Sequence, residues 1–424
     1  MKGNFIIKRA SFINAPKEKI EVTDMLFSRD SLGVCKVSLS KNEKKTLRDG
    51  TTIVDGDGIY VAPAFCDVRC NVGDVFRRGG APDISSADYG GYGVICPTPT
   101  WDSAEYPETP AMFEKYNKKL KSYGGIKILP AVPIVKKHLS ASPSDIYGIA
   151  EKGGSIFTDA TPTGYLDNST LRQIMIKVAN VNGLLILTSH DKKIALDGTV
   201  NKGRAETLTS QKGIPHSAEL LSVMRNIILA EETGCRIHIA GISLGRSVEM
   251  IRNAKKRGVA ITCSVAPPYF SYTEEELIFR GAMAKLLPPL RSSDDLSAVI
   301  AGLADGTIDC IETDHVPVSA SAKKDLTTGA FGSTGFETAF GAGITNLVKT
   351  GHITLFRLIE LMSIKPYEIL FGKKFEISDL AVTGVVKLDL TGGGIYSKQR
   401  SLLAGRVSVF DGAYLYGDAK KISF

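Results

Sequence analysis

The sequence predicts an α/β protein, a (β/α)8 TIM barrel with a small β-sandwich domain formed by both termini. Three observations favour this architecture. Short apolar runs of strand length alternate with helical patterns about eight times through the middle of the chain. Both ends instead carry short β-like runs separated by polar turns. No Gly-x-Gly-x-x-Gly motif follows any of the strand-like runs, although a doubly wound open sheet stays open as an alternative.

The two β-rich ends are predicted to fold together as one composite domain of residues 1–58 and 372–424. Asp49-Gly50 and Asp55-Gly56 are turn dipeptides that suit tight connections between strands. The strands expected in this domain are Asn4–Ile7, Val34–Leu39, Thr51–Val54, Val382–Leu390, Val407–Phe410 and Tyr414–Tyr416.

Residues 59–371 are predicted to form the barrel. Its expected strands are Val61–Val68, Gly93–Cys96, Ile126–Pro130, Ser155–Phe157, Leu184–Thr188, Arg236–Ile239, Ala260–Cys263 and Asp309–Ile311. Helical patterns include Ser217–Thr233, Gly245–Arg257, Ser292–Leu303, Leu355–Met362 and Pro366–Phe371. Two loops rich in glycine, serine and lysine, Ala195–Pro215 and Ser319–Gly335, are expected to build or cover the active site.

The composition is that of an ordinary globular protein: 424 residues, 43% hydrophobic and 23% charged, with a net charge of +7. No long basic run is present, so we expect no nucleic-acid binding. The segment Met1–Phe5 is unlike a signal peptide and no apolar run is long enough to span a membrane, so we expect a soluble cytoplasmic protein that does not contact membranes. The cysteines show no paired spacing and are expected to be reduced: Cys35, Cys66, Cys70, Cys96, Cys235, Cys263 and Cys310.

The stretch Val61–Asp74 reads Val-Ala-Pro-Ala-Phe-Cys-Asp-Val-Arg-Cys-Asn-Val-Gly-Asp, a buried strand running into a loop. It resembles the opening strand of the dihydroorotase branch of the amidohydrolase superfamily, which has Ala-Pro-Gly-Phe-x-Asp-x-His-x-His-x-Arg. The resemblance implies that the two histidine positions bind metal and the arginine position holds the substrate carboxylate. Here those positions are Arg69, Asn71 and Gly73.

A second stretch, Asp305–His315, is similar to the family's Asp-Gly-x-Ile-Asp-x-Ile-x-Thr-Asp-His. The resemblance implies that Asp314 stands at the metal-binding general-base position. Alone, an Asp-His pair is more often a capped turn. His190 and Asp159 match two further metal-ligand positions, whereas Gly241 replaces a ligand histidine.

The sixth predicted strand also contains His238, at the position of a family histidine that is structural. Strand alternation puts His238 on the face opposite that of Gly241, so we do not expect it to bind metal. The substrate contacts of the family are replaced as well. Its Met-Pro-Asn-Thr is Cys96–Pro99 here, with Thr98 in place of the asparagine, and Leu287 replaces the asparagine of Lys-x-Asn-Pro-Pro-Leu-Arg.

Arg69 places a permanent cation where the family binds a divalent ion, and two positive charges repel. We therefore predict that zinc, the metal implied by the resemblance, is absent or limited to one ion. We also predict that Arg69 forms a salt bridge with the remaining carboxylates Asp67, Asp159 or Asp314 and replaces the charge of the metal.

The resemblance covers essentially the whole chain and implies a dihydroorotase homologue of pyrimidine biosynthesis whose catalysis is impaired or absent, with a role as a scaffold for aspartate transcarbamoylase. The alternative is an active cyclic amidohydrolase with one metal at Asp159, His190 and Asp314. A third possibility is a regulatory protein that binds a small anion through Arg69 and Arg291. We also expect a homo-oligomer.

Overall fold

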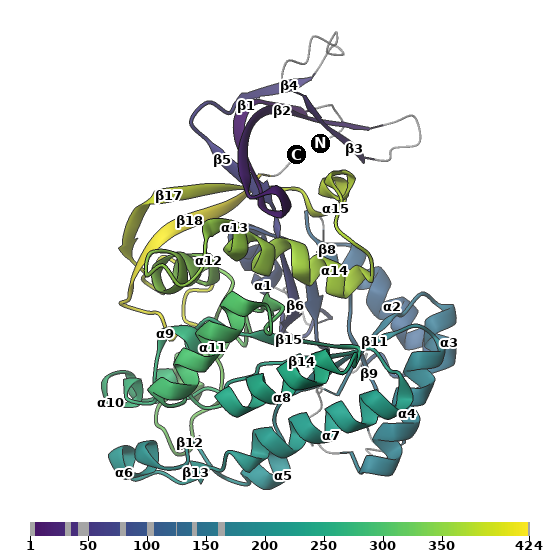
Figure 1. Cartoon of the computed structure of the whole chain (residues 1–424), viewed down its shortest axis with the longest axis vertical. Coiled ribbons are helices and arrows are strands. Elements are labelled where there is room, and N and C mark those ends of the chain that lie inside the picture. Colours follow the sequence, from purple (N-terminus) through teal and green to yellow (C-terminus); the bar gives the residue numbers. More distant parts are fainter. Residues whose placement is uncertain are drawn as a thin grey trace.

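The computed structural model describes residues 5–29, 35–40, 51–76, 82–99, 106–123, 125–137, 142–159 and 166–422. A barrel of parallel strands surrounded by helices lies beside a sheet built from both ends of the chain (Figure 1). The architecture is the predicted barrel with a β domain.

A barrel strand overlaps each of the eight predicted runs, and one further short strand, β9, lies just beyond the run predicted at Ile126–Pro130. Their bounds are β6 (Phe65–Cys70), β7 (Tyr92–Pro97), β8 (Lys127–Ile128), β9 (Val132–Pro133), β10 (Ile156–Thr158), β11 (Leu184–Thr188), β14 (Ile237–Ala240), β15 (Ile261–Val265) and β16 (Cys310–Ile311). The strands pair in parallel in the orders β6-β7-β8 and β9-β10-β11-β14-β15-β16. A parallel bridge between Cys70 and His315 joins the end of β6 to the segment after β16. This bridge connects the first barrel strand to the last.

The predicted strand Val61–Val68 is wrong as a single element. β5 (Tyr60–Pro63) pairs with β1 (Phe5–Asn14) and β17 (Val385–Ile395) in the terminal sheet, and β6 begins only at Phe65. Between them, the amide of Ala64 donates to the carbonyl of Gly384 at 3.1 Å. Both strands are largely buried, so the apolar sequence continues through Ala64. The hydrophobic pattern therefore gives no sign that one strand ends and another begins there.

The terminal sheet has the order β18-β17-β5-β1-β2-β3, with β4 also paired to β1. Its other strands are β2 (Lys19–Arg29), β3 (Cys35–Ser40), β4 (Thr52–Asp55) and β18 (Tyr414–Ile422). β2 was not predicted. The predicted strand Val407–Phe410 is wrong, because this buried segment is irregular and ends in a turn; the Val407 amide donates to the carbonyl of Val318 at 2.9 Å.

The three long helices whose bounds were predicted begin and end within two residues of the prediction. α7 (Ser217–Thr233) has the predicted bounds and ends at Gly234 in the left-handed region, with φ of 66°. α11 (Ser293–Asp305) begins after Ser292, whose hydroxyl accepts the amide of Asp295. The other long helices are α1 (Pro82–Tyr89), α2 (Pro110–Lys121), α4 (Asn168–Asn180) and α8 (Gly245–Lys256). Shorter ones are α3 (Ile146–Glu151), α9 (Pro268–Ser271), α10 (Glu276–Arg280), α12 (Ala339–Gly343), α13 (Leu355–Ile359), α14 (Lys365–Phe371) and α15 (Leu380–Thr383).

The two loops expected at the active site have structure of their own. Residues 195–215 contain β12 (Val200–Asn201), α6 (Arg204–Thr209) and β13 (Gly213–Ile214), and follow the one-turn helix α5 (Lys192–Ala195). Residues 319–335 include a 3₁₀ turn at Ala320–Ala322. Both segments follow the carboxyl ends of barrel strands, where barrel enzymes place their active sites.

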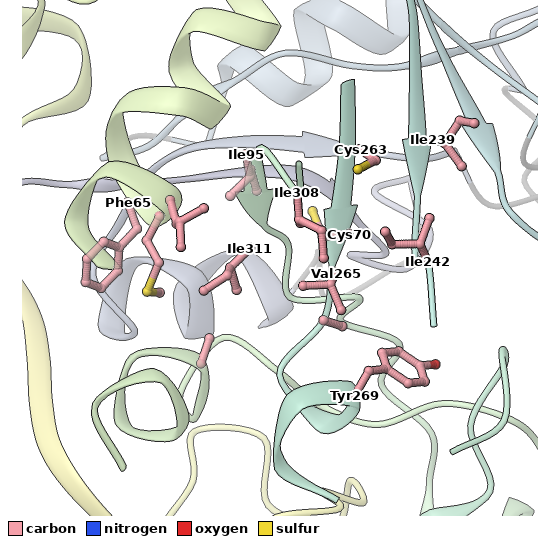
Figure 2. Packing of buried hydrophobic residues seen from close by; sticks show 14 of the residues in the cluster. Phe65, Cys70, Ile95, Ile239, Ile242, Cys263, Val265, Tyr269, Ile308 and Ile311 are labelled. Atoms are coloured by element: carbon pink, nitrogen blue, oxygen red, sulfur yellow. The ribbon is translucent and has the colours of Figure 1, made fainter. Parts of the chain in front are cut away.

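The main hydrophobic core lies between the barrel strands and the helices around them, and a second cluster takes the alternate residues of the same strands. Figure 2 shows Ile239, Cys263, Val265 and Ile311 on neighbouring strands of this core, with Tyr269 on α9 beyond the strand ends. Six cysteines are described by side chain, and all six are buried free thiols. Among the helices of the described ranges, none has the length and apolar character needed to cross a bilayer.

Candidate functional site

The site lies at the carboxyl ends of the barrel strands, and β6 supplies its first side chains. The pairing of β6 with β7 shifts register between Asp67 and Cys70, so the direction of the Arg69 side chain does not follow from simple strand alternation. The Arg69 guanidinium reaches across to the segment that follows β16. Its Nη1 lies 3.3 Å from Oε1 of Glu312, and its Nη2 lies 3.1 Å from Oδ1 of Asp314. The predicted salt bridge of Arg69 is therefore confirmed at Asp314, and Glu312 is a partner that the sequence analysis missed.

The three charged groups are well shielded from water. The exposed fraction of the side chain is 18% for Arg69, 14% for Asp314 and zero for Glu312. Asp314 has a φ of 45°, a backbone conformation that residues other than glycine rarely adopt. Burial raises the pKa of Asp314, and the adjacent Arg69 cation opposes that rise. The result is a buried ion-pair network at the position where the resemblance implies a metal.

Asp67 was one of the three carboxylates predicted to pair with Arg69. Its hydrogen bonds in the structure are made elsewhere, and it forms no salt bridge with the Arg69 guanidinium. Its Oδ1 accepts the backbone amides of Arg69 and Thr313, each at 3.2 Å, and its Oδ2 accepts the Thr313 hydroxyl. Burial raises the pKa of Asp67 to about 7. Asp67 thus connects β6 to the segment after β16 and supports the closure of the barrel.

Glu312 is the most strongly perturbed carboxyl of this network. Burial raises its pKa from 4.5 to about 8, against the opposing effect of Arg69. Its Oε2 accepts the hydroxyl of Ser264 at 2.8 Å. Ser264 in turn lies 2.9 Å from Nε2 of His238.

We expect the stability contributed by Glu312 to fall as pH rises. Because the pKa is higher in the folded chain, the native state holds more protons than the unfolded state between about pH 4.5 and pH 8. Glu312→Gln removes this titration, so the variant should gain about 1–2 kcal/mol of unfolding free energy relative to the wild type between pH 6 and pH 8. Urea denaturation across this range measures the difference, and a difference that does not change with pH would contradict the prediction.

Asp159 and His190 follow β10 and β11, two neighbouring strands. The carboxylate of Asp159 accepts the Thr188 amide at 2.8 Å and the Thr188 hydroxyl at 3.2 Å. Burial raises the pKa of Asp159 to about 6. His190 is buried, and neither of its ring nitrogens has a hydrogen-bond partner among the described residues. Burial, reinforced by the Arg291 cation, lowers the pKa of His190 to about 4, so its ring is neutral at pH 7.

His238 makes hydrogen bonds with both ring nitrogens, Nδ1 to Thr262 and Nε2 to Ser264, each at 2.9 Å. Burial lowers its pKa to about 3. Strand alternation suggested that His238 lies away from the site, but Ser264 connects it to Glu312. Neither nitrogen is available to a metal, in agreement with the prediction that His238 is structural.

The substituted metal positions are also engaged within the chain. The Asn71 side-chain oxygen accepts the amide of Gly73 at 2.8 Å. A Cβ atom added at Gly241 would lie 3.3 Å from Nη1 of Arg69 and 3.4 Å from Oε1 of Glu312. A side chain at position 241 would therefore enter the space in which the arginine meets the glutamate.

These residues do not fit the zinc implied by the family resemblance. Zinc in proteins is held by nitrogen, sulfur and carboxylate ligands, and the Arg69 cation already occupies the carboxylates on this side of the barrel. Among the described residues, no group of three or more histidine, cysteine, aspartate or glutamate side chains is arranged to hold a metal ion. The structure thus does not bring Asp159, His190 and Asp314 together as a ligand set.

The replaced substrate positions offer little for recognising a carboxylate or an amide. The Thr98 hydroxyl donates to the carbonyl of Cys70 at 3.2 Å. Leu287 packs against the cluster of Ala195, Ile214 and Ala218. Beside Asp314 is a cavity of about 10 Å³, which has room for one water molecule.

Arg291, the second cation of the anion-binding hypothesis, is buried in a network of its own. Its guanidinium donates to Glu219 at 3.2 Å, to Ser243 at 2.9 Å and to Asn201 at 2.6 Å. Arg69 and Arg291 are therefore both paired within the chain, which leaves the anion-binding hypothesis without structural support.

Two residues of the site had a usable signal in the sequence. Glu312 stands two positions before Asp314 at the end of a strand, and period-two alternation places both on one face. His315 follows in the same motif. It accepts the amide of Gly335 at Nδ1 and lies 3.3 Å from the Asp83 carboxylate of α1. Its role is to tie the loop before α12 to the barrel.

No family model matches the chain, whereas curated relatives match it in sequence and solved structures match its fold. A dihydroorotase of Staphylococcus aureus (strain Mu50) is 32% identical over 324 residues, 76% of each protein. A dihydroorotase of Macrococcus caseolyticus is 29% identical and the match covers 95% of this chain and 94% of that one. The L-hydantoinase of Arthrobacter aurescens has a TM-score of 0.81 at 23% identity, with 99% and 94% of the two chains covered. The D-hydantoinase of a Thermus species has a TM-score of 0.79 at 18% identity, covering 98% and 93%.

Proposed function

The chain belongs to the dihydroorotase family, and from this premise we propose that it is a homologue that has lost metal-dependent hydrolysis and serves the pyrimidine pathway as a non-catalytic protein. In a hydrolase of this kind, zinc lowers the pKa of a bound water and polarises the amide carbonyl. The observation that carries the proposal is the Arg69 guanidinium, which lies between Glu312 and Asp314. A permanent cation at this position repels a divalent ion and occupies the carboxylates that would bind it.

The loss of substrate contacts supports the same conclusion. A hydrolase that had only changed its substrate would keep its metal ligands and vary the residues around them. This chain replaces both sets, at Arg69, Asn71 and Gly241 for the metal and at Gly73, Thr98 and Leu287 for the substrate. The residues that hydrolysis requires have therefore been replaced, whereas the buried residues that hold the barrel together are retained.

The non-catalytic role that the family resemblance implies is that of a scaffold for aspartate transcarbamoylase. Aspartate transcarbamoylase produces carbamoyl aspartate, which a dihydroorotase then cyclises. A homologue without hydrolytic activity can be retained as the structural partner of that enzyme.

One observation favours a second candidate, a hydrolase that uses a single metal. The buried neutral ring of His190 has no hydrogen-bond partner among the described residues, and neutral imidazole is the form that binds metal. Against this candidate, Asp159 is bound by Thr188 and Asp314 is bound by Arg69. Both carboxylates would have to leave these partners to reach a metal.

Metal content and activity separate the two candidates. We expect the untagged chain, purified from cells grown with added zinc, to contain close to no metal per chain by mass spectrometry and to leave dihydroorotate unhydrolysed. About one tightly held metal per chain, lost in His190→Ala, together with turnover of dihydroorotate would overturn the proposal.

The scaffold role is tested by sedimentation of the chain mixed with the aspartate transcarbamoylase of the same organism. A complex is expected, and two unshifted species would exclude it.

A further inference from the structure

Two buried lysines fasten the segment that follows β16. Lys285 is 2% exposed and Lys323 is 5% exposed. The Lys323 ammonium donates to the carbonyl of Lys285 at 2.9 Å and to the carbonyl of Gly332. The Lys285 ammonium donates to the carbonyl of Thr327 at 3.0 Å and lies 4.7 Å from the centre of the Phe331 ring. The segment after β16 is therefore attached by two cations to the chain that precedes α11.

We call residues 320–332 the strap, because a β-bridge fixes the chain just outside each of its ends. Ser319 forms one bridge with Arg406, and Ser333 forms the other with His315. Apart from a single 3₁₀ turn at its start, the strap contains no helix or strand. A loop held in this way can open and close through changes in a few backbone angles near its ends.

Neither ammonium group has a carboxylate as its partner in the described part of the chain. The charged group that acts on Lys323 is Lys285, a like charge, and the one that acts on Lys285 is Asp325. Asp325 itself accepts the amide and the hydroxyl of Thr328, each at 2.7 Å. Burying two like charges together is costly, and the loss of one proton removes much of this cost.

Lys323 is the group that gives up the proton. Burial, reinforced by the Lys285 cation, lowers the pKa of Lys323 from 10.5 to about 7. A neutral amine keeps two N–H bonds, so Lys323 can still donate to both of its carbonyl partners after it loses the proton. In an open strap Lys323 is in water, where the pKa of a lysine is about 10.4. Opening therefore takes up a proton at pH values between these two pKa values.

We propose that the strap is a pH-sensitive lid at the mouth of the barrel, and that it opens when Lys323 takes up a proton. The strap follows β16 at the carboxyl ends of the strands, where barrel proteins bind their ligands. Leu286, the neighbour of the Lys285 anchor, lines the cavity beside Asp314. Opening the strap releases the segment that borders this cavity and so controls access to the site. This control does not depend on whether the site hydrolyses anything.

Hydrogen exchange measured by mass spectrometry tests the lid, because the observed exchange rate divided by the intrinsic rate gives the opening constant. The intrinsic rate is proportional to hydroxide concentration, so amides elsewhere in the chain should exchange about tenfold faster at pH 9 than at pH 8. In the strap, the opening constant should fall nearly tenfold over the same step, because closing releases one proton. Peptides containing Gly332, whose amide donates to the carbonyl of Lys285 at 3.3 Å, should therefore exchange at almost the same rate at both pH values. A tenfold rise in these peptides would overturn the proposal.

The variant Lys323→Gln assigns the effect to this residue. Glutamine can donate to the same carbonyls but does not titrate, so the strap of this variant should exchange about tenfold faster at pH 9 than at pH 8, as the rest of the chain does. The matched control is Lys324→Gln, because Lys324 is the next residue and is exposed, and it should behave as the wild type. Unchanged exchange outside the strap confirms that both variants are folded. If the strap of Lys323→Gln still exchanged at the same rate at both pH values, slow closing and not a proton on Lys323 would be the cause, and the proposal would be rejected.

Discussion

Replacing Arg69 with alanine should lower the free energy of unfolding by about 3–5 kcal/mol near pH 7.5, because removing one partner of a buried ion pair leaves the other charge unpaired. Arg69 is in contact with Glu312 and Asp314, and all three side chains are largely shielded from water. Without the guanidinium, the buried Asp314 carboxylate would lose its counter-ion, whereas Glu312, with a pKa of about 8, is largely protonated at pH 7.5. Urea denaturation of the wild type and the variant measures the loss.

The loss in Arg69→Ala should become smaller in acid. Burial already raises the pKa values of Glu312 and Asp314, and removing the cation raises them further. Once both carboxyls are protonated they need no counter-ion, so the difference between variant and wild type should shrink between pH 7.5 and pH 5.5.

The matched control is Arg257→Ala, which removes an arginine from an exposed pair with Glu231. Exposed ion pairs contribute about 0–1 kcal/mol, so this variant should be close to the wild type at both pH values. If Arg69→Ala behaved like Arg257→Ala, the role of Arg69 as the counter-ion of the carboxylate network would be refuted.

The sequence predicts most barrel strands and three of the long helices because these elements carry a local signal. α7 combines a helical pattern with a glycine directly after its last residue, and its predicted bounds are the observed ones. β2 lacks such a signal, since its buried positions include the polar Thr23 and Asp24 while Ile20 and Val22 are exposed. Asp24 is tolerated there because its carboxylate accepts the amide of Arg9, at an irregularity in β1. That partner is known only once the sheet is formed.

The site is predicted in position and only partly in its contacts. The strand ends place Arg69 and Asp314 on the same side of the barrel, which suffices to predict an ion pair between them. The contact with Glu312 joins residues 243 positions apart and depends on how β6 meets β16. That neither ring nitrogen of His190 has a partner in the described part of the chain also depends on packing around the ring, and no sequence pattern reports packing.

The largest effect away from the site is expected at Glu219, a buried residue of α7 that holds several groups in place. Its carboxylate accepts the amides of Ser243 and Leu244 at 2.9 and 3.0 Å, and lies 3.2 Å from the Arg291 guanidinium. Glu219→Gln removes the charge and turns an NH₂ group toward these donors. The buried Arg291 cation then has no counter-charge in this network, so we expect a loss of about 3–5 kcal/mol in unfolding free energy.

A double-mutant cycle separates the charge from the packing in this network. Glu219→Leu and Arg291→Met should each be strongly destabilising, while the double variant should lose less than the sum of the two, because no charge is left unpaired. Additive losses would contradict this account. Asn201→Ala removes the acceptor of Arg291 and the donor to Glu274, and leaves the Glu219–Arg291 pair in place, so it should cost about 1–2 kcal/mol. Its main effect should be faster hydrogen exchange in residues 198–214, since Asn201 connects that segment to the barrel through Arg291 and Glu274.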